Sequence, residues 1–228
     1  MSFAQEASIV TYKVAVFENE LNQVVNPYIN NKTKKFIKSI EESEFVLVFN
    51  RSFSIFKLKR SMKVGNKRNA DASVIAGGIR YKNIPDNVSI QQKELLGEIF
   101  NIHHDLVSYD WKILRETKLV AGFMCYKAVA QTKTISFSDG NEKSIEVIAW
   151  FTPEIPLPFG PAGIDGLPGL VMLASANGGN VFFYVDKIEK KKTIEVKDFI
   201  DLKKGLNISE KDYLKLVYEK YLAIKNKS

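Results

Sequence analysis

Apolar and polar residues alternate in short stretches along most of this chain, and each such stretch predicts a β-strand with one buried face. The first covers residues 8–16, and the stretches 45–49 and 53–58 flank Asn50 and Arg51 as a predicted hairpin. The further predicted strands are 109–117, 119–131, 132–138, 144–152, 169–175, 180–189 and 193–196. Turns are predicted at Thr117-Lys118, Asp139-Gly140-Asn141 and Asn177-Gly178-Gly179. This pattern indicates an array of antiparallel hairpins.

Helical periodicity replaces the alternation near the two ends of the chain. Asn26 can cap a helix that begins at Pro27. Ser209 and Asp212 form a capping box for a second helix. The apolar faces of these helices consist of Ile29, Phe36, Ile37 and Ile40, and of Leu214, Val217, Tyr218, Tyr221 and Leu222. Both helices are therefore predicted to be amphipathic.

The order of these elements predicts an α+β fold in one domain. Strands do not alternate with helices, so a parallel sheet is not expected. We predict a curved antiparallel β-sheet with both amphipathic helices packed on one face. Residues 60–87 are weakly patterned and predict a long connection with at most one short strand near 74–79. The domain is predicted to cover residues 8–228, and residues 1–7 are predicted to be either a signal-peptide remnant or a disordered start.

A loop rich in proline and glycine interrupts the strand pattern between Pro153 and Gly169. It holds five of the seven prolines and four of the thirteen glycines of the chain. Each proline removes a backbone donor and restricts the residue before it. The residues between the prolines are nevertheless apolar, so the loop must lie against something. We expect it either to wedge against the sheet or to form one wall of a pocket, and its missing N–H groups argue against a phosphate cradle.

The segment from Gly163 to Met172, GIDGLPGLVM, resembles the signature of the GLPGLI family, with Val171 in place of the final isoleucine. The strand pair around Trp111 and Cys125 and the stretch 149–156 are also similar to that family's pattern. Family members are typically exported proteins of Gram-negative bacteria that carry a signal peptide, and their function is unknown. The resemblance therefore implies a periplasmic or secreted protein and transfers no catalytic residue.

Composition and charge narrow the classes of partner. The chain has 228 residues and a formal net charge of +7, but the lysines are spread along it without a recognition motif, so no nucleic acid is expected. No apolar run approaches the roughly 20 residues that span a bilayer. The start at 1–7, with Ala4-Gln5 before the first strand, is typical of the remnant of a cleaved secretory signal. The single cysteine excludes an intramolecular disulfide.

Candidate chemical groups are few. His103 and His104 are adjacent, and neighbouring residues of a strand point to opposite faces, so the two are not expected to bind one metal ion. One of them could act with Asp105, Glu116 or Cys125 as a hydrolase or metal-dependent enzyme. Cys125 lies in an apolar run, which favours an inert core residue. No catalytic triad, metal motif or cofactor fingerprint is recognised, and no cofactor is expected.

The sequence therefore favours an exported, non-enzymatic binding protein. Its predicted site is an apolar groove walled by the 153–169 loop, for a lipid or other apolar small molecule, a peptide or an outer-membrane protein. The residues predicted to contact the ligand or partner are Trp111, Trp150, Glu154, Leu157, Phe159, Leu167 and Pro168. The enzyme that uses His103 or His104 is the alternative. In a third hypothesis the loop docks the chain, as a peripheral subunit, onto a membrane assembly.

Overall fold

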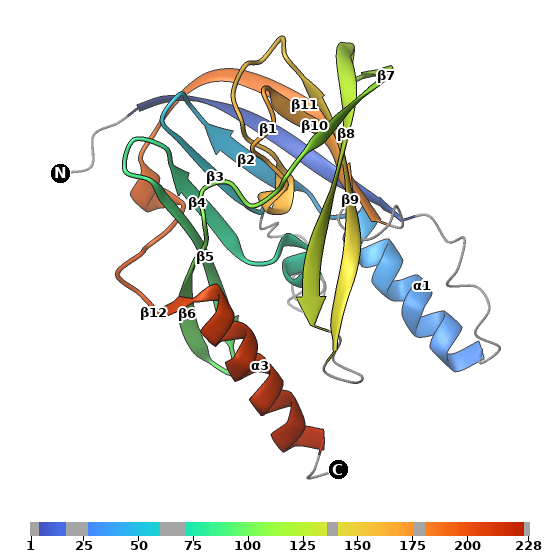
Figure 1. Cartoon of the computed structure of the whole chain (residues 1–228), viewed down its shortest axis with the longest axis vertical. Helices are drawn as coiled ribbons and strands as arrows, with labels where there is room; N and C mark the ends of the chain where they lie inside the picture. Colours follow the sequence, from blue (N-terminus) through green and yellow to red (C-terminus); the bar gives the residue numbers. More distant parts are fainter. Residues whose placement is uncertain (1–4, 17–26, 60–71, 136–140, 176–180, 226–228) are drawn as a thin grey trace.

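A computed structural model describes residues 5–16, 27–59, 72–135, 141–175 and 181–225, and in it one twelve-stranded sheet organises the chain (Figure 1). The sheet order is β12-β6-β5-β4-β3-β2-β1-β11-β10-β9-β8-β7. The strands are β1 (Gln5–Val16), β2 (Phe45–Phe49), β3 (Phe53–Leu58), β4 (Ile79–Asn83), β5 (Val88–Leu95), β6 (Glu98–His103), β7 (Lys112–Val120), β8 (Phe123–Ile135), β9 (Glu142–Thr152), β10 (Leu170–Ser175), β11 (Val181–Ile194) and β12 (Leu206–Ser209). Neighbouring strands are antiparallel except for β12, which runs parallel to β6. The sheet therefore has β12 and β7 as its edges.

The predicted α+β fold is wrong, because the molecule is mostly β. Within the described residues, helix is limited to α1 (Pro27–Glu41), α3 (Glu210–Lys225), a helical segment at 72–76 and short 3-10 turns. Both long helices extend beyond the strands (Figure 1). In α3 one side chain, Tyr213, is buried. The amphipathic pattern predicted the two helices correctly, but too few of their apolar residues reach the sheet for them to form its cover.

The main hydrophobic core lies on one face of the sheet, which we call the inner face. Tyr12 of β1 pairs with Phe45, whose ring packs on Phe56 and Phe183 with centroid distances of 6.1 and 5.1 Å. Phe159 from the proline-rich loop packs against the same layer. These aromatic contacts bury large apolar surfaces, so the loop covers much of the inner face that the helices were expected to cover.

Local sequence signals placed some turns correctly and others wrongly. The hairpin of β2 and β3 has the predicted bounds. The turn between β7 and β8 is at Ala121 and Gly122, with φ of 49° and 84°, and not at Thr117-Lys118. Residues 74–79 were predicted to hold a strand, but 72–76 are helical and β4 begins at Ile79. The residue type alone misses Ala121, because a left-handed conformation there is set by the strand register on either side.

Other predicted features fall on residues that the structure does not describe. These are Asn26, positions 139–140 of one turn, the turn 177–179 and the first four residues of the chain. The capping box of the second helix is described and confirmed: Ser209 Oγ lies 2.6 Å from an Asp212 carboxylate oxygen and accepts the Asp212 N–H at 3.1 Å. None of the described helices has the length and apolarity needed to cross a membrane.

Candidate functional site

The 153–169 loop, between β9 and β10, is fixed to the inner face by its apolar side chains. Phe159, Ile164 and Leu167 are each 1% exposed. Phe159 belongs to the main core, while Ile164 and Leu167 pack with Ala128 and neighbouring residues of β9 and β10. The loop is therefore part of the core, and these side chains do not line open space.

Polar contacts hold the same loop in register. Asp165 accepts a hydrogen bond from Lys82 Nζ at 2.7 Å, and both side chains are nearly inaccessible to solvent. The Trp111 indole N–H donates to the Asp165 carbonyl at 2.8 Å, and Tyr12 donates from its hydroxyl to the Val171 carbonyl at 2.6 Å. Burial raises the pKa of Asp165, and Lys82 acts in the opposite direction. A buried pair of this kind fixes geometry, because separating it leaves a charge without compensation.

Gly163 brings the loop backbone against Arg80 of β4. Its φ is 83°, and a β-carbon placed on it would lie 2.5 Å from Arg80 Nη1 and 2.8 Å from Cζ. Gly163 ends the 3-10 turn η2 (Pro161–Gly163). Only glycine both adopts this conformation easily and leaves room for the guanidinium, so the loop and Arg80 share one wall.

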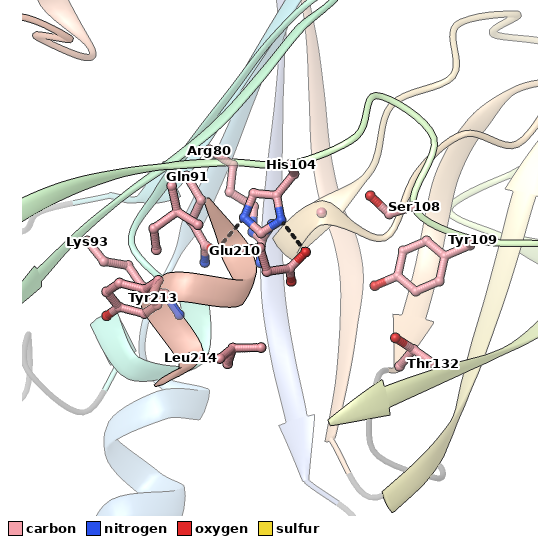
Figure 2. Close-up of a pocket in the computed structure, with 12 residues that line it drawn as sticks. Arg80, Gln91, Lys93, His104, Ser108, Tyr109, Thr132, Glu210, Tyr213 and Leu214 are labelled. Atoms are coloured by element: carbon pink, nitrogen blue, oxygen red, sulfur yellow. Dashed lines mark hydrogen bonds and ion pairs between the residues drawn. The ribbon is translucent and has the colours of Figure 1, made fainter. Parts of the chain in front are cut away.

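A polar pocket of about 240 Å³ opens at this wall. Figure 2 shows its two sides: Arg80, Gln91, Lys93, His104, Glu210, Tyr213 and Leu214 on one, and Ser108, Tyr109 and Thr132 on the other. Ile102 and Gly163 complete the lining. The residues come from β4, β5, β6, β8, α3 and two loops, so the pocket exists because opposite parts of the sheet approach each other on the inner face.

Arg80 is a cation without a partner in this pocket. Its Nε is buried and has no hydrogen-bond acceptor among the described residues. Lys93, one strand away, has its ammonium 5.8 Å from the centre of the Tyr213 ring, and no described carboxylate forms an ion pair with it. Burial lowers the pKa of both side chains. A buried donor left unpaired costs about 1–3 kcal/mol, and among these two cations that donor is Arg80 Nε.

His104 is held between two acceptors. Its Nδ1 lies 3.1 Å from Glu210 Oε2, and its Nε2 lies 3.0 Å from Gln91 Oε1. The Gln91 amide cannot be reversed, because its Nε2 donates to the carbonyl of Gly77. The imidazole of His104 therefore links Glu210 of α3 to Gln91 of β5. The hydrogen bond between His104 and Glu210 lowers the pKa of Glu210, because it stabilises the charged carboxylate.

Chemically, this arrangement suits binding better than acid–base catalysis. Arg80 and Lys93 offer N–H donors toward the pocket, and Ser108, Tyr109 and Thr132 offer hydroxyl groups across it. Both nitrogens of His104 are already engaged, one by Glu210 and the other by Gln91. Within the described part of the chain, no group of three His, Cys, Asp or Glu side chains could hold a metal ion.

The residues of the predicted enzyme alternative are not brought together. His103 is exposed and its Nε2 lies 3.1 Å from Asn207 Oδ1, whereas His104 enters the pocket. Glu116 accepts two hydrogen bonds from Lys127, at 3.2 and 2.9 Å. Cys125 is fully buried, and burial raises its thiol pKa to about 11. Asp105 is exposed, and neither histidine has a hydrogen bond to Asp105, Glu116 or Cys125 among the described contacts.

The residues predicted for an apolar groove fall mostly in two core clusters. Trp150, Leu157 and Phe159 belong to the main cluster, and Trp111 and Leu167 to the second. The ring of Trp150 lies under the ammonium of Lys118 at 4.0 Å. Glu154 is exposed and accepts the Met124 N–H at 3.1 Å. Leu157 is half-buried and Pro168 is exposed, whereas Phe159 and Leu167 are buried in the core.

Sequence reasoning missed the cationic side of the pocket. Arg80 lies in the stretch 60–87, which was predicted to be a long connection, and Glu210 was treated as part of the first turn of a helix. A usable signal was nevertheless present: Arg80 and Lys82 alternate with apolar Ile79 and Tyr81, as expected of a strand with one charged face. A charged face on a central strand indicates a polar site, because such strands usually bury apolar residues.

Comparisons with known proteins identify the fold and one short family match. A sequence profile described as "Protein of unknown function (Porph_ging)" matches residues 136–173, which include the proline-rich loop. Two solved structures of PNGF-II, in space groups C2 and P21, superpose with TM-scores of 0.57 and 0.56 at 14% and 15% identity. They cover 95% and 94% of this chain but 32% and 33% of theirs, so the chain spans about a third of their length. No protein with a curated description matches the sequence.

Proposed function

We propose that this chain binds a small organic anion in the pocket formed by Arg80, Lys93 and His104. One observation carries the proposal: Arg80 projects to the inner face with a buried Nε that has no acceptor among the described residues. Arginine is always charged, and its planar donors match carboxylate and phosphate groups. An anionic group of a ligand would supply the missing acceptor.

The size and lining of the pocket support the same proposal. Its volume of about 240 Å³ is close to the lower end, about 300 Å³, of the range of small-ligand sites. Tyr213, Leu214 and Ile102 provide apolar contacts beside the cations, as in sites for small ligands. The pocket therefore suits a ligand of the size of a small metabolite.

Binding of simple anions tests the proposal. Inorganic phosphate and acetate are titrated into the purified chain, with calorimetry and thermal unfolding as readouts. We expect saturable binding and a rise in Tm with ligand concentration, since a ligand of the folded state stabilises it. Arg80→Met is expected to abolish both. Lys118→Met, which removes a cation over Trp150 outside the pocket, is the control. Binding that is equal in the wild type and Arg80→Met would overturn the proposal.

Kinship and export remain separate proposals. The GIDGLPGLVM segment and the match of residues 136–173 to an uncharacterised family support kinship with the GLPGLI proteins. The resemblance of that segment to a family of exported proteins supports export from a Gram-negative cell. Fractionation of the native host tests this: we expect the protein in the periplasm or the medium, and a purely cytoplasmic protein would contradict it. A lipid, peptide or outer-membrane partner stays a prediction, and its expected groove gives way to the polar pocket as our proposed site.

A further inference from the structure

We propose that the ligand of this pocket carries two negative charges, one bound by Arg80 and one by Lys93. The inference rests on the proposed function and names the ligand class. Both residues project from the same face of neighbouring strands, since Arg80 pairs with Gln91 and Lys93 follows Gln91 by two positions. Each is half-buried, and each lacks a carboxylate partner among the described ion pairs.

The Arg80 guanidinium and the end of the Lys93 side chain lie near the same residue and line the same pocket. A β-carbon placed on Gly77 would lie 3.7 Å from Arg80 Nη2 and 3.9 Å from Lys93 Cε. Two like charges this close repel each other, and Arg80 accordingly contributes to lowering the pKa of Lys93. A single ligand can therefore reach both cations, and a doubly charged ligand would relieve their repulsion.

Neither Arg80 nor Lys93 has a carboxylate ion-pair partner among the described residues. The carboxylates that act on Arg80 belong to Asp165 and Glu210. Asp165 is already bound to Lys82, and Glu210 to His104. Two acid groups of one ligand would give each of the two cations an ion-pair partner, whereas a monoanion could supply only one.

The side of the pocket opposite the cations indicates which uncharged polar groups the ligand has. Ser108, Tyr109 and Thr132 present hydroxyl groups opposite the cations (Figure 2). These groups would bond polar atoms of the ligand body. A dicarboxylate and a phosphate monoester share the required chemistry, namely two negative charges on a small polar body, and the test below separates them.

Matched pairs of anions test the charge requirement at one size. Succinate is compared with its monoamide, succinamate, and methyl phosphate with dimethyl phosphate, at pH 8, where the phosphate monoester is doubly ionised. Calorimetry of the wild-type chain is expected to give at least about tenfold tighter binding of each dianion that fits than of its monoanionic partner. The better of the two dianions identifies the carboxylate or the phosphate class. Added salt is expected to weaken dianion binding more than monoanion binding.

The variant Lys93→Met isolates the second charge. It keeps the length of the side chain and removes the ammonium, and circular dichroism verifies that it folds. We expect it to bind the dianion and the monoanion of a pair with equal affinity, while Lys118→Met keeps the wild-type preference. Equal affinities in the wild type, or a preference that persists in Lys93→Met, would overturn the dianion inference and leave anion binding intact. Failure of all four probes to bind would instead overturn the proposed function.

Discussion

Two cations on the same face of β4 have opposite surroundings. Lys82 is 8% exposed, donates to Asp165 at 2.7 Å and also donates to the carbonyl of Leu106 at 2.8 Å. Arg80, two positions earlier, has no hydrogen-bond partner for its buried Nε among the described residues. The proline-rich loop runs alongside both, and it places Asp165 at Lys82 and Gly163 at Arg80.

This difference distinguishes a structural ion pair at Lys82 from a candidate ligand site at Arg80. At Lys82 the loop provides the carboxylate of Asp165, which neutralises the buried ammonium. At Arg80 the loop provides a glycine, so the guanidinium packs against the loop backbone and receives no carboxylate from it. Native proteins tolerate an unsatisfied polar group mainly where function requires it. The contrast between Lys82 and Arg80 is therefore the main support for a ligand at Arg80.

Removing the acid of the satisfied pair is expected to have the largest effect. Asp165→Ala leaves the Lys82 ammonium buried without its counter-ion and is predicted to lower the free energy of unfolding by about 3–5 kcal/mol. Urea denaturation measures this loss. The double variant Lys82→Met/Asp165→Ala is expected to recover most of it, because no charge is then left buried. If the free energy of unfolding of Asp165→Ala were within about 1 kcal/mol of the wild type, the Lys82–Asp165 pair would not be a structural contact.

Two glycines of the loop allow the contact with Arg80 to be tested with a matched control. Gly163 and Gly166 have φ of 83° and 84°, so alanine at either is expected to cost about 1–2 kcal/mol of stability from backbone strain. A β-carbon at Gly163 meets the Arg80 guanidinium, whereas one at Gly166 has Trp111 Nε1 at 3.9 Å as its nearest neighbour. Gly163→Ala should therefore displace Arg80 and lose anion binding, measured by calorimetry, and Gly166→Ala should keep it. Equal affinities would argue against Arg80 as the anion contact.

Substitution of the unsatisfied cation is expected to have the opposite sign from substitution of Asp165. Arg80→Met removes a buried donor without a partner, so the free energy of unfolding should rise by about 1 kcal/mol in the absence of ligand. Gain of stability with loss of binding is typical of residues kept for function. Chemical denaturation in a buffer without phosphate or carboxylates measures the effect. A loss of more than about 1 kcal/mol would indicate that Arg80 contributes to the fold in the way that Lys82 does.

Many of the strands could be predicted from the sequence, but β5, β6 and β12 and the order of the strands in the sheet could not. Alternation gave β1 and the hairpin of β2 and β3, since it reflects one buried face within each strand. Alternation does not show which element packs on which face of the sheet. The helices were therefore predicted to pack on the face where the proline-rich loop lies. The strand β12 was missed because Leu206–Ser209 is short and mostly exposed, and it exists through its pairing with β6.

The candidate site was predictable only in part. The 153–169 loop was expected either to wedge against the sheet or to form one wall of a pocket; its apolar side chains pack in the core, and its Gly163 also lines the polar pocket. The apolar residues chosen with it, such as Phe159 and Leu167, are buried in the core instead. His104 was named, but its true partner Glu210 lies 106 positions later in the chain, at the start of α3. Contacts this distant depend on strand order, which the residue pattern does not encode.

Removing the contact between His104 and Glu210 is expected to have the smallest effect on stability. The hydrogen bond to His104 lowers the pKa of Glu210 below its ordinary value of 4.5 in the folded chain. A lowered carboxylate pKa stabilises the fold above the unfolded pKa, and this stability is lost as the pH falls through the folded value. The side chain of Glu210 is 59% exposed, so solvent screening limits the contribution to about 0.5 kcal/mol. Unfolding free energies of the wild type and Glu210→Gln should therefore differ by a constant amount between pH 5 and pH 6 and converge below about pH 4. A difference that persists unchanged at pH 3 would mean that Glu210 acts through its position at the start of α3 and not through its charge on the pocket.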